Sequence, residues 1–548
     1  MPKVCKTYNL QHIVFLMIVA LLYGCNSVTK HENEKRIFRL NYSAGTVESI
    51  DPAFAKNLYN MWTDHMVYNT LVETDEQLRL VPSLASHWQV SADGLTYTIY
   101  LRNDVFFQDA PEFPGGKGRR MSAADVVYSF SRLIDPSVAS TGAWIFNDRV
   151  AAKAPFAALN DSTVQIKLRA PFRPLPQILT MPYCSIVPRE VVTRWGRDFA
   201  RHPCGTGPFQ FHYWDEGNVL VLRKNQRYWE RDSAGQQLPY IDAVQVTFAD
   251  SKATEFFLFL QHRLDFVNGL DGSFKDLVFN KDGSLKKEFA SKLTLEKNTY
   301  LNTEYIGFIT DSSNAVMAGA PTRNVLVRKA INYAIDRKKI VMYFRNGIVQ
   351  PALSGFIPAG MPGYDSTHHY GYDYDPQKAL DLLAKAGYPN GRGLGTLVIH
   401  TPDNWSDAVN FIVTELQEVG ISAKVEIIQR NIELQQMAKS KLPAFRSQWI
   451  ADYPDAETFL AFFYGRFPAP PNYTRFSDPV FDKWYEESMN VPDTTRWQLY
   501  KKMDSLVMAK APVIPLFYDE MLHFLQPNVT GFHSNPMNLI DLKRVKKN

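Results

Sequence analysis

The strongest limit on the fold comes from a strand–helix–strand pattern in the second half of the chain. Residues 397–401 are rich in β-branched side chains and predict a strand, and a helix with one apolar face is predicted from about Ser406 to Gly420. Residues 425–428 predict a second strand. A helical crossover of this kind joins two parallel strands of one sheet. The pattern therefore predicts a parallel sheet in this half of the protein.

Alternating strand and helix signals extend the same class over the rest of the 548 residues. Leu95 to Leu101 alternates apolar and polar side chains after an Asp-Gly turn, which predicts a half-buried strand. Ser122 with an acid three positions later predicts the start of a helix, and Asp375 followed by Pro376 predicts another. A chain of this length allows roughly three to four folding units. The predicted fold class is α/β with mixed sheets.

The amino terminus predicts export from the cytoplasm. Residues 13–23 form an unbroken apolar run of 11 residues, after a start that holds Lys3 and Lys6. A helix that crosses a bilayer needs about 20 residues, so this run is too short to span one. A cleavable signal peptide has this length and this basic start.

The apolar run ends in Leu22-Tyr23-Gly24-Cys25, which resembles the bacterial lipobox, a motif whose cysteine is acylated and becomes the first mature residue. We therefore predict a signal peptide over residues 1–24, lipidation of Cys25, and a polar tether over residues 25–35. Stable anchoring takes two or more acyl chains, because a single chain binds a membrane only marginally. The alternative is an ordinary signal peptide that happens to end near a cysteine.

Two cysteines remain after the signal peptide and the lipidated residue are set aside, Cys184 and Cys204. An even pair in an oxidising compartment predicts one disulfide. Closing a loop of about 20 residues would stabilise the fold by roughly 3 kcal/mol in the chain-entropy model. Two buried thiols are the alternative, because the sequence gives no distance between the two residues.

Charge and motifs exclude several classes of function. Lys and Arg number 60 against 56 Asp and Glu, a formal net charge of +4, so nothing indicates nucleic acid as a partner. The sequence holds no H-E-x-x-H, no paired C-x-x-C, no G-x-S-x-G and no Walker A motif, and we expect neither a cofactor nor a metal. The adjacent His368 and His369 chelate poorly and indicate a solvated loop.

Three acids lie close together at Asp452, Asp455 and Glu457. Paired carboxylates could serve a glycosidase, and acid clusters can bind calcium. The spacing does not match the calcium-binding loop, and aspartates of this kind more often form local turn and cap bonds. We therefore predict no catalytic residues, and an exported hydrolase that uses Asp452 and Asp455 stays as a lesser alternative.

Several short segments occur in an order that is typical of one family. They are Ser49-Ile50-Asp51-Pro52, Tyr68–Val72, Pro82–Trp88, Ser91–Tyr97, Ala123–Phe130, Gly205–Phe209, Asn225 with Tyr228-Trp229, and Val327–Ala330 with Ala334–Arg337. Together they resemble the bacterial extracellular solute-binding proteins of family 5, the peptide- and oligopeptide-binding components of ABC importers. The resemblance runs from about Arg36 to the end of the chain.

The resemblance implies a two-lobed, hinged periplasmic-binding-protein fold of the class II or cluster C type, with mixed sheets and an extra subdomain. The lobes are joined by two crossing segments and close over the ligand. Lobe one would comprise residues 36–57, 200–270 and 514–548, with the extra subdomain at residues 58–199 and lobe two at residues 271–513.

The segment Trp449-Ile450-Ala451-Asp452-Tyr453-Pro454-Asp455 carries the predicted binding chemistry. In peptide binders of this family, the aspartate that matches Asp452 receives the free α-amino group of the ligand. A desolvated ammonium needs a charged acceptor, and charge-assisted hydrogen bonds are roughly twice as strong as neutral ones. The structural alternative is an aspartate that only ties down its own turn before Pro454.

The resemblance also implies recognition through the backbone, because an extended peptide can pair with strands of both lobes. One edge would be Tyr42-Ser43-Ala44-Gly45-Thr46 and the other Trp449-Ile450-Ala451. The side chain of Trp449 could line a pocket or belong to the core. The residue that binds the ligand carboxylate is not predicted.

The predicted function is that of a monomeric, lipid-anchored protein in the bacterial cell envelope, on the periplasmic side. It would capture a peptide and deliver it to an ABC permease and ATPase on other chains, with no enzyme activity. The alternatives on the same fold are a nickel complex, haem or an oligosaccharide as ligand, and a peptide-sensing receptor that does not transport.

Overall fold

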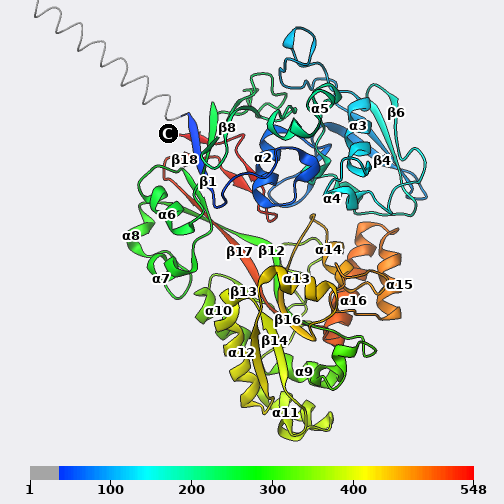
Figure 1. Ribbon diagram of the computed structural model, residues 1–548, viewed down its shortest axis with the longest axis vertical. Helices are drawn as coiled ribbons and strands as arrows, with labels where there is room; N and C mark the ends of the chain where they lie inside the picture. Colours follow the sequence, from blue (N-terminus) through cyan, green and yellow to red (C-terminus); the bar gives the residue numbers. More distant parts are fainter. Residues whose placement is uncertain (1–35) are drawn as a thin grey trace, which may run out of the picture.

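The computed structural model describes residues 36–548, and these form two lobes, one above the other in Figure 1. The predicted signal peptide, the lipidation site Cys25 and the tether lie outside the described residues. Within residues 36–548, none of the helices is both long and apolar enough to cross a bilayer.

The upper lobe is built on two four-stranded sheets. One has the order β1 (Ile37–Tyr42), β10 (Ala243–Phe248), β9 (Val219–Lys224) and β8 (Phe209–Asp215), with β1 parallel to β10. The other has the antiparallel order β4 (Ala85–Val90), β5 (Thr96–Leu101), β7 (Thr163–Lys167) and β6 (Phe156–Asn160). Both sheets contribute to one hydrophobic core. The strand predicted at residues 95–101 is therefore confirmed as β5.

The other elements of the upper lobe are helices and short strand pairs. The helices are α2 (Leu58–Val67), α3 (Ala123–Ile134), α4 (Leu175–Ile178) and α5 (Arg189–Trp195). The short strands are β2 (Val72–Thr74), β3 (Leu80–Pro82), β18 (Val529–Thr530), β19 (His533–Ser534), β20 (Ile540–Asp541) and β21 (Lys546–Lys547).

The lower lobe is built on a seven-stranded mixed sheet. Its order is β11 (Phe266–Asn268), β17 (Val513–Leu525), β12 (Thr294–Phe308), β16 (Ala444–Ile450), β14 (Leu397–Thr401) and β15 (Ala423–Ile427), with β13 (Gln350–Pro351) paired to β17. Strands β14 and β15 are parallel and α12 (Ser406–Glu418) joins them, which confirms the predicted strand–helix–strand unit.

Ten further helices surround this sheet. They are α6 (Lys252–Leu260), α7 (Lys275–Val278), α8 (Lys287–Ala290), α9 (Val325–Tyr333), α10 (Arg337–Arg345), α11 (Pro376–Lys385), α13 (Arg430–Ala438), α14 (Glu457–Leu460), α15 (Pro479–Ser488) and α16 (Asp493–Lys510). The predicted helix starts are confirmed, because the Asp375 carboxylate accepts from the Lys378 N–H at 2.9 Å and Ser122 forms a capping box with Asp125.

Two long antiparallel strands, β12 and β17, run side by side from the upper lobe into the lower one (Figure 1). Strand β11 pairs with the end of β17, and these two strands contribute to both cores: Phe266 and Leu525 pack in the upper core, whereas Val267 and Phe524 pack in the lower one.

The predicted disulfide is not formed in the structure. Cys184 and Cys204 are both free and buried. The Cys184 thiol contacts the Ile178 carbonyl at 3.7 Å, whereas the Cys204 thiol contacts the Gln108 carbonyl at 3.5 Å. Burial raises the pKa of both thiols above the ordinary value, so each stays a neutral, apolar part of the core. This corrects the prediction in favour of two buried thiols.

Candidate functional site

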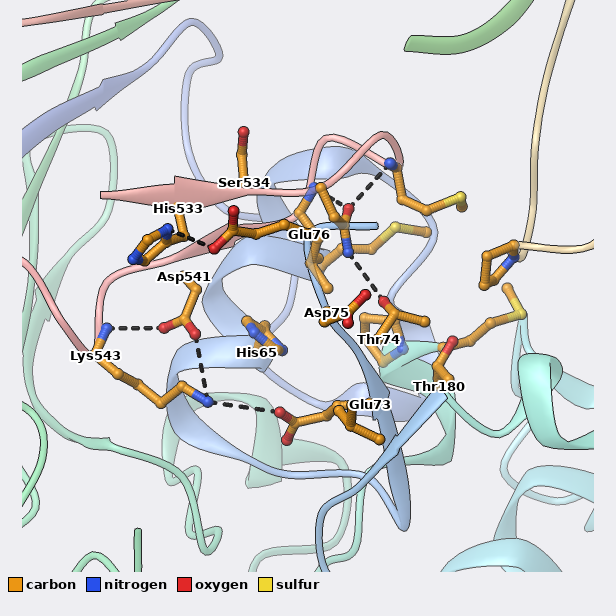
Figure 2. Close-up of a pocket in the computed structure, with 18 of the residues that line it drawn as sticks. His65, Glu73, Thr74, Asp75, Glu76, Thr180, His533, Ser534, Asp541 and Lys543 are labelled. Atoms are coloured by element: carbon orange, nitrogen blue, oxygen red, sulfur yellow. Dashed lines mark hydrogen bonds and ion pairs between the residues drawn. The ribbon is translucent and has the colours of Figure 1, made fainter. Parts of the chain in front are cut away.

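A cavity of about 550 Å³ lies between the two lobes. The lower lobe contributes the turn Asp452-Tyr453-Pro454, which follows β16. The upper lobe contributes side chains from α2, from the β2–β3 hairpin and from the C-terminal segment 533–544 (Figure 2). A volume of this size is within the usual range for small-molecule sites, roughly 300–1,000 Å³.

The turn that carries Asp452 is held by the strand before it and the helix after it. Strand β16 pairs with β12 along its length, and the Ala451 N–H continues this pairing by donating to the Leu301 carbonyl at 2.9 Å. Thr458, on α14, donates its hydroxyl to the Asp452 carboxylate at 3.3 Å and accepts the Asp452 N–H at 3.4 Å. The Asp452 side chain is therefore directed by a buried threonine.

Asp452 is exposed to the cavity and enclosed by protein on both sides. Burial raises the pKa of its carboxyl to about 6; the Thr458 hydrogen bond lowers it, the negative charge of Glu457 raises it, and Arg149 lowers it. Among residues 36–548, no lysine, arginine or histidine forms an ion pair with this carboxylate. At neutral pH it is therefore a cavity-facing anion that lacks a cationic partner from the protein.

The two neighbouring acids face the protein interior. Asp455 is buried, pairs with Arg496 at 2.9 Å and accepts the Tyr500 hydroxyl at 2.9 Å. Glu457 is also buried and accepts the hydroxyls of Tyr453 and Tyr485. Asp455 does not line the cavity, so the structure does not support the acid pair that the hydrolase alternative needs.

The upper wall of the cavity is a charged network centred on Lys543 (Figure 2). The Lys543 ammonium lies 2.8 Å from Glu230, 3.3 Å from Asp541 and 3.6 Å from Glu73. No local motif predicts this network, because Glu73, Glu230 and the pair Asp541 and Lys543 come from three distant parts of the chain. Only the late return of the chain to the upper lobe brings them together.

The predicted backbone edge at residues 42–46 does not line this cavity. Tyr42 is fully buried, with its ring stacked on Tyr59 at 4.6 Å and its hydroxyl 3.2 Å from Thr63. The Ser43 hydroxyl donates to Glu255 at 2.6 Å. The side chain of Tyr42 is thus part of the core.

Gly45 and Thr46, at the end of the same predicted edge, also lie away from the cavity. Gly45 is exposed, and the Thr46 hydroxyl is buried with no hydrogen-bond partner.

The other predicted edge lies on β16, directly before Asp452. The Trp449 indole N–H donates to the Thr458 carbonyl at 2.8 Å and its ring lies 5.4 Å from Phe462, so this side chain belongs to the core. Ile450 is 37% exposed and Ala451 is buried. On the side away from β12, β16 is paired with β14 only at Phe445, so among the described residues no strand covers that edge beyond it.

The tandem histidines lie in a loop, as predicted for a solvated segment. The His368 ring nitrogen Nδ1 is 2.9 Å from the Asp365 carboxylate. Within residues 36–548, no three His, Cys, Asp or Glu side chains are grouped as metal ligands.

The sequence profile of the bacterial extracellular solute-binding proteins, family 5 (Middle), matches residues 79–470. Among curated proteins, the glutathione-binding protein GsiB of Escherichia coli O6:K15:H31 (strain 536 / UPEC) is 26% identical over 497 residues, which cover 89% of this chain and 90% of GsiB. The family profile spans most of the chain, in agreement with the motifs identified in the sequence.

Solved structures of the same fold cover nearly the whole chain. HbpA2 from Haemophilus parasuis has a TM-score of 0.80 at 23% identity and covers 93% of this chain and 99% of its own. The ABC transporter-associated periplasmic binding protein DppA from Helicobacter pylori, in complex with the peptide STSA, has a TM-score of 0.72 at 24% identity and covers 94% and 99%. The protein therefore has the two-lobed periplasmic-binding-protein fold, and it belongs to family 5 of the bacterial extracellular solute-binding proteins, which serve ABC importers.

Proposed function

We propose that this protein captures a peptide between its two lobes and holds the α-ammonium group of the peptide on Asp452. The observation that carries the proposal is the Asp452 carboxylate, which faces the cavity and lacks a protein cation. A desolvated ammonium is bound most strongly by an ionised acceptor. The ligand ammonium would then be the cationic partner of the Asp452 carboxylate.

The edge of β16 that has no strand partner supports the same ligand class. Residues 447–450 precede Asp452 and have no strand neighbour on the side away from β12 within the described chain. An extended peptide can add to such an edge through main-chain hydrogen bonds, with affinity that is largely independent of side chains. Among the relatives, DppA was solved with the peptide STSA and GsiB is named a glutathione-binding protein.

Glutathione is the second candidate ligand, because the curated relative GsiB is named a glutathione-binding protein. It is a tripeptide with a γ-linkage and keeps a free α-ammonium, so Asp452 could bind it in the same way. Titrating the purified protein with Ala-Ala-Ala, its N-acetylated form and glutathione by calorimetry tests both candidates. We expect the acetylated peptide to bind far more weakly than the free peptide, and equal affinities would contradict the role of Asp452.

We also propose that Cys25 carries the lipid anchor and that the loaded protein delivers its ligand to an ABC permease and ATPase on other chains. The lipobox sequence supports the anchor. Membership of a family of importer components supports the delivery. We propose that the anchored protein acts as a monomer on the periplasmic side.

Peptide affinity should depend on pH through Asp452. The pKa of its carboxyl is about 6 in the free protein, and only the ionised form can pair with an ammonium. Lowering the pH from 7 to 5 protonates most of this carboxyl while the ligand ammonium stays charged, so we expect affinity to fall about tenfold. Calorimetry across this range checks the prediction. The Asp452→Asn variant is the control, because its weaker affinity should not change over the same range.

Thr458 is expected to position Asp452. The Thr458→Val variant keeps the shape of the side chain and removes the hydroxyl that donates to the carboxylate at 3.3 Å. Losing one such hydrogen bond should weaken peptide binding about threefold to tenfold. The matched control is Thr414→Val on α12, whose hydroxyl donates only to the Asn410 carbonyl at 3.1 Å; it should bind peptide like the wild type. Equal affinities in the two variants would show that Thr458 does not position the carboxylate.

A further inference from the structure

The charges that line the cavity are unbalanced. Six carboxylates line it, from Glu73, Asp75, Glu76, Glu230, Asp452 and Asp541. Only two permanent cations, Lys543 and Arg544, line it with them. A peptide with one α-ammonium and one α-carboxylate has no net charge, and it would leave this excess of negative charge in place.

Both cations are already engaged by acids of the same wall. The Lys543 side chain is 8% exposed and lies within 4 Å of three carboxylates. Arg544 pairs with Glu230 at 2.9 Å. Because several acids share these two cations, neither cation offsets the remaining acids of the cavity.

Among the acids of the upper wall that form ion pairs, Glu76 is the most exposed. Its side chain is 53% exposed, and its partner is His533, whose Nδ1 lies 2.7 Å from the carboxylate (Figure 2). A histidine carries a full positive charge only when it is protonated. Asp75 next to it pairs with Arg79, which does not line the cavity.

We infer that the preferred ligand is a peptide that carries a lysine or arginine side chain in addition to its α-ammonium. The inference rests on the proposed function and deepens it by naming the class of peptide. A concave site of one sign with low-dielectric walls concentrates ligands of the opposite charge and rejects those of the same charge. Asp452 binds the amino terminus, and the acidic upper wall around Glu76 binds the basic side chain.

Calorimetry with matched peptides tests the inference. The probes are Ala-Lys-Ala and Ala-Ala-Lys, the same peptides with Nε-acetyl-lysine, and Ala-Glu-Ala. We expect at least one lysine peptide to bind about tenfold more tightly than its acetylated partner, and the glutamate peptide to bind more weakly than both. The preference should shrink at high salt, because mobile ions screen charges over about 10 Å at 0.1 M ionic strength.

Two variants test whether Glu76 causes the preference for a lysine side chain. The ratio of the affinity for the lysine peptide to that for its acetylated partner should be about threefold smaller in Glu76→Gln than in the wild type. Glu48→Gln is the matched control, because Glu48 is 54% exposed, pairs with Lys56 at 2.7 Å and does not line the cavity; it should leave the ratio unchanged.

The outcomes separate this inference from the proposed function. If peptides bind through Asp452 but lysine and acetyl-lysine peptides bind equally, the inference is wrong and the proposed function stands. If none of the peptides binds, both are wrong. An effect of Glu48→Gln as large as that of Glu76→Gln would also contradict the assignment of the acidic wall.

Discussion

Replacing Asp452 by asparagine is expected to weaken the binding of a free peptide about 100-fold. Asparagine keeps the size of the side chain and an oxygen that can accept from Thr458, which lies 3.3 Å from the native carboxylate. It removes the negative charge that we propose pairs with the ligand ammonium in a cavity lined by both lobes. Removing one partner of a buried, hydrogen-bonded charge pair typically costs about 2–5 kcal/mol, largely because the other charge stays unpaired.

The N-acetylated peptide is the control ligand for this variant. It has no ammonium to lose, so its weak affinity should be nearly the same in the wild type and in Asp452→Asn. The variant should fold normally. The pKa of Asp452 is higher in the folded protein than in the unfolded chain, so above pH 4 the ionised carboxylate destabilises the folded state, and asparagine removes this cost. Its stability at pH 7 should therefore equal or exceed that of the wild type. An unchanged affinity for the free peptide would overturn the proposed function.

The second large effect is expected on stability, from replacing Arg496 by methionine. Arg496 is 1% exposed, and its guanidinium lies 2.9 Å from the buried Asp455 carboxylate and 3.0 Å from Asp493. Methionine fills a similar volume but leaves Asp455 without its cation. We expect the free energy of unfolding to fall by about 3–5 kcal/mol in chemical denaturation, the usual cost of an orphaned buried charge.

Two further variants give this measurement its controls. Lys56→Met breaks an exposed pair of similar distance, that with Glu48 at 2.7 Å, and should change stability by less than about 1 kcal/mol. Combining Arg496→Met with Asp455→Asn removes both charges and should recover much of the loss. A loss of the same size in Lys56→Met, or no recovery in the double variant, would contradict the importance of the buried pair.

Arg496→Met should also weaken peptide binding, because Asp455 organises the turn that carries Asp452. The Asp455 carboxylate accepts the Glu457 N–H at 3.0 Å, at the start of α14. Thr458, the next residue on that helix, contacts Asp452. The buried ion pair Arg496–Asp455 is therefore connected through Glu457 and Thr458 to the Asp452 carboxylate, which faces the cavity.

The elements that sequence patterns predicted well are those whose cause is local. The parallel unit at residues 397–427 follows from hydrophobic periodicity and a helix of the right length, and the structure confirms it. The cap of α11 depends on Asp375 and a donor three residues later. Asp452 was selected by a short motif, and the structure places it in the cavity between the lobes.

The prediction that was wrong, the disulfide, concerns two residues whose relation depends on distance through space. The two buried cysteines form an even pair in the sequence, but each thiol contacts a different carbonyl, and no disulfide joins them. A one-dimensional pattern of residue types contains no information on either contact.

Local sequence was thus sufficient for the fold class, the family and Asp452, one of the acids that line the cavity, because strand and helix periodicity, caps and motifs act over fewer than about 20 residues. The charge of the cavity wall needed the folded chain. Glu73 and Lys543 meet in the upper lobe only because β17 carries the chain back from the lower lobe, and the same return sets His533 against Glu76. Electrostatic interactions depend on separation in space, and for these residues the separation is decided by how the two lobes are connected.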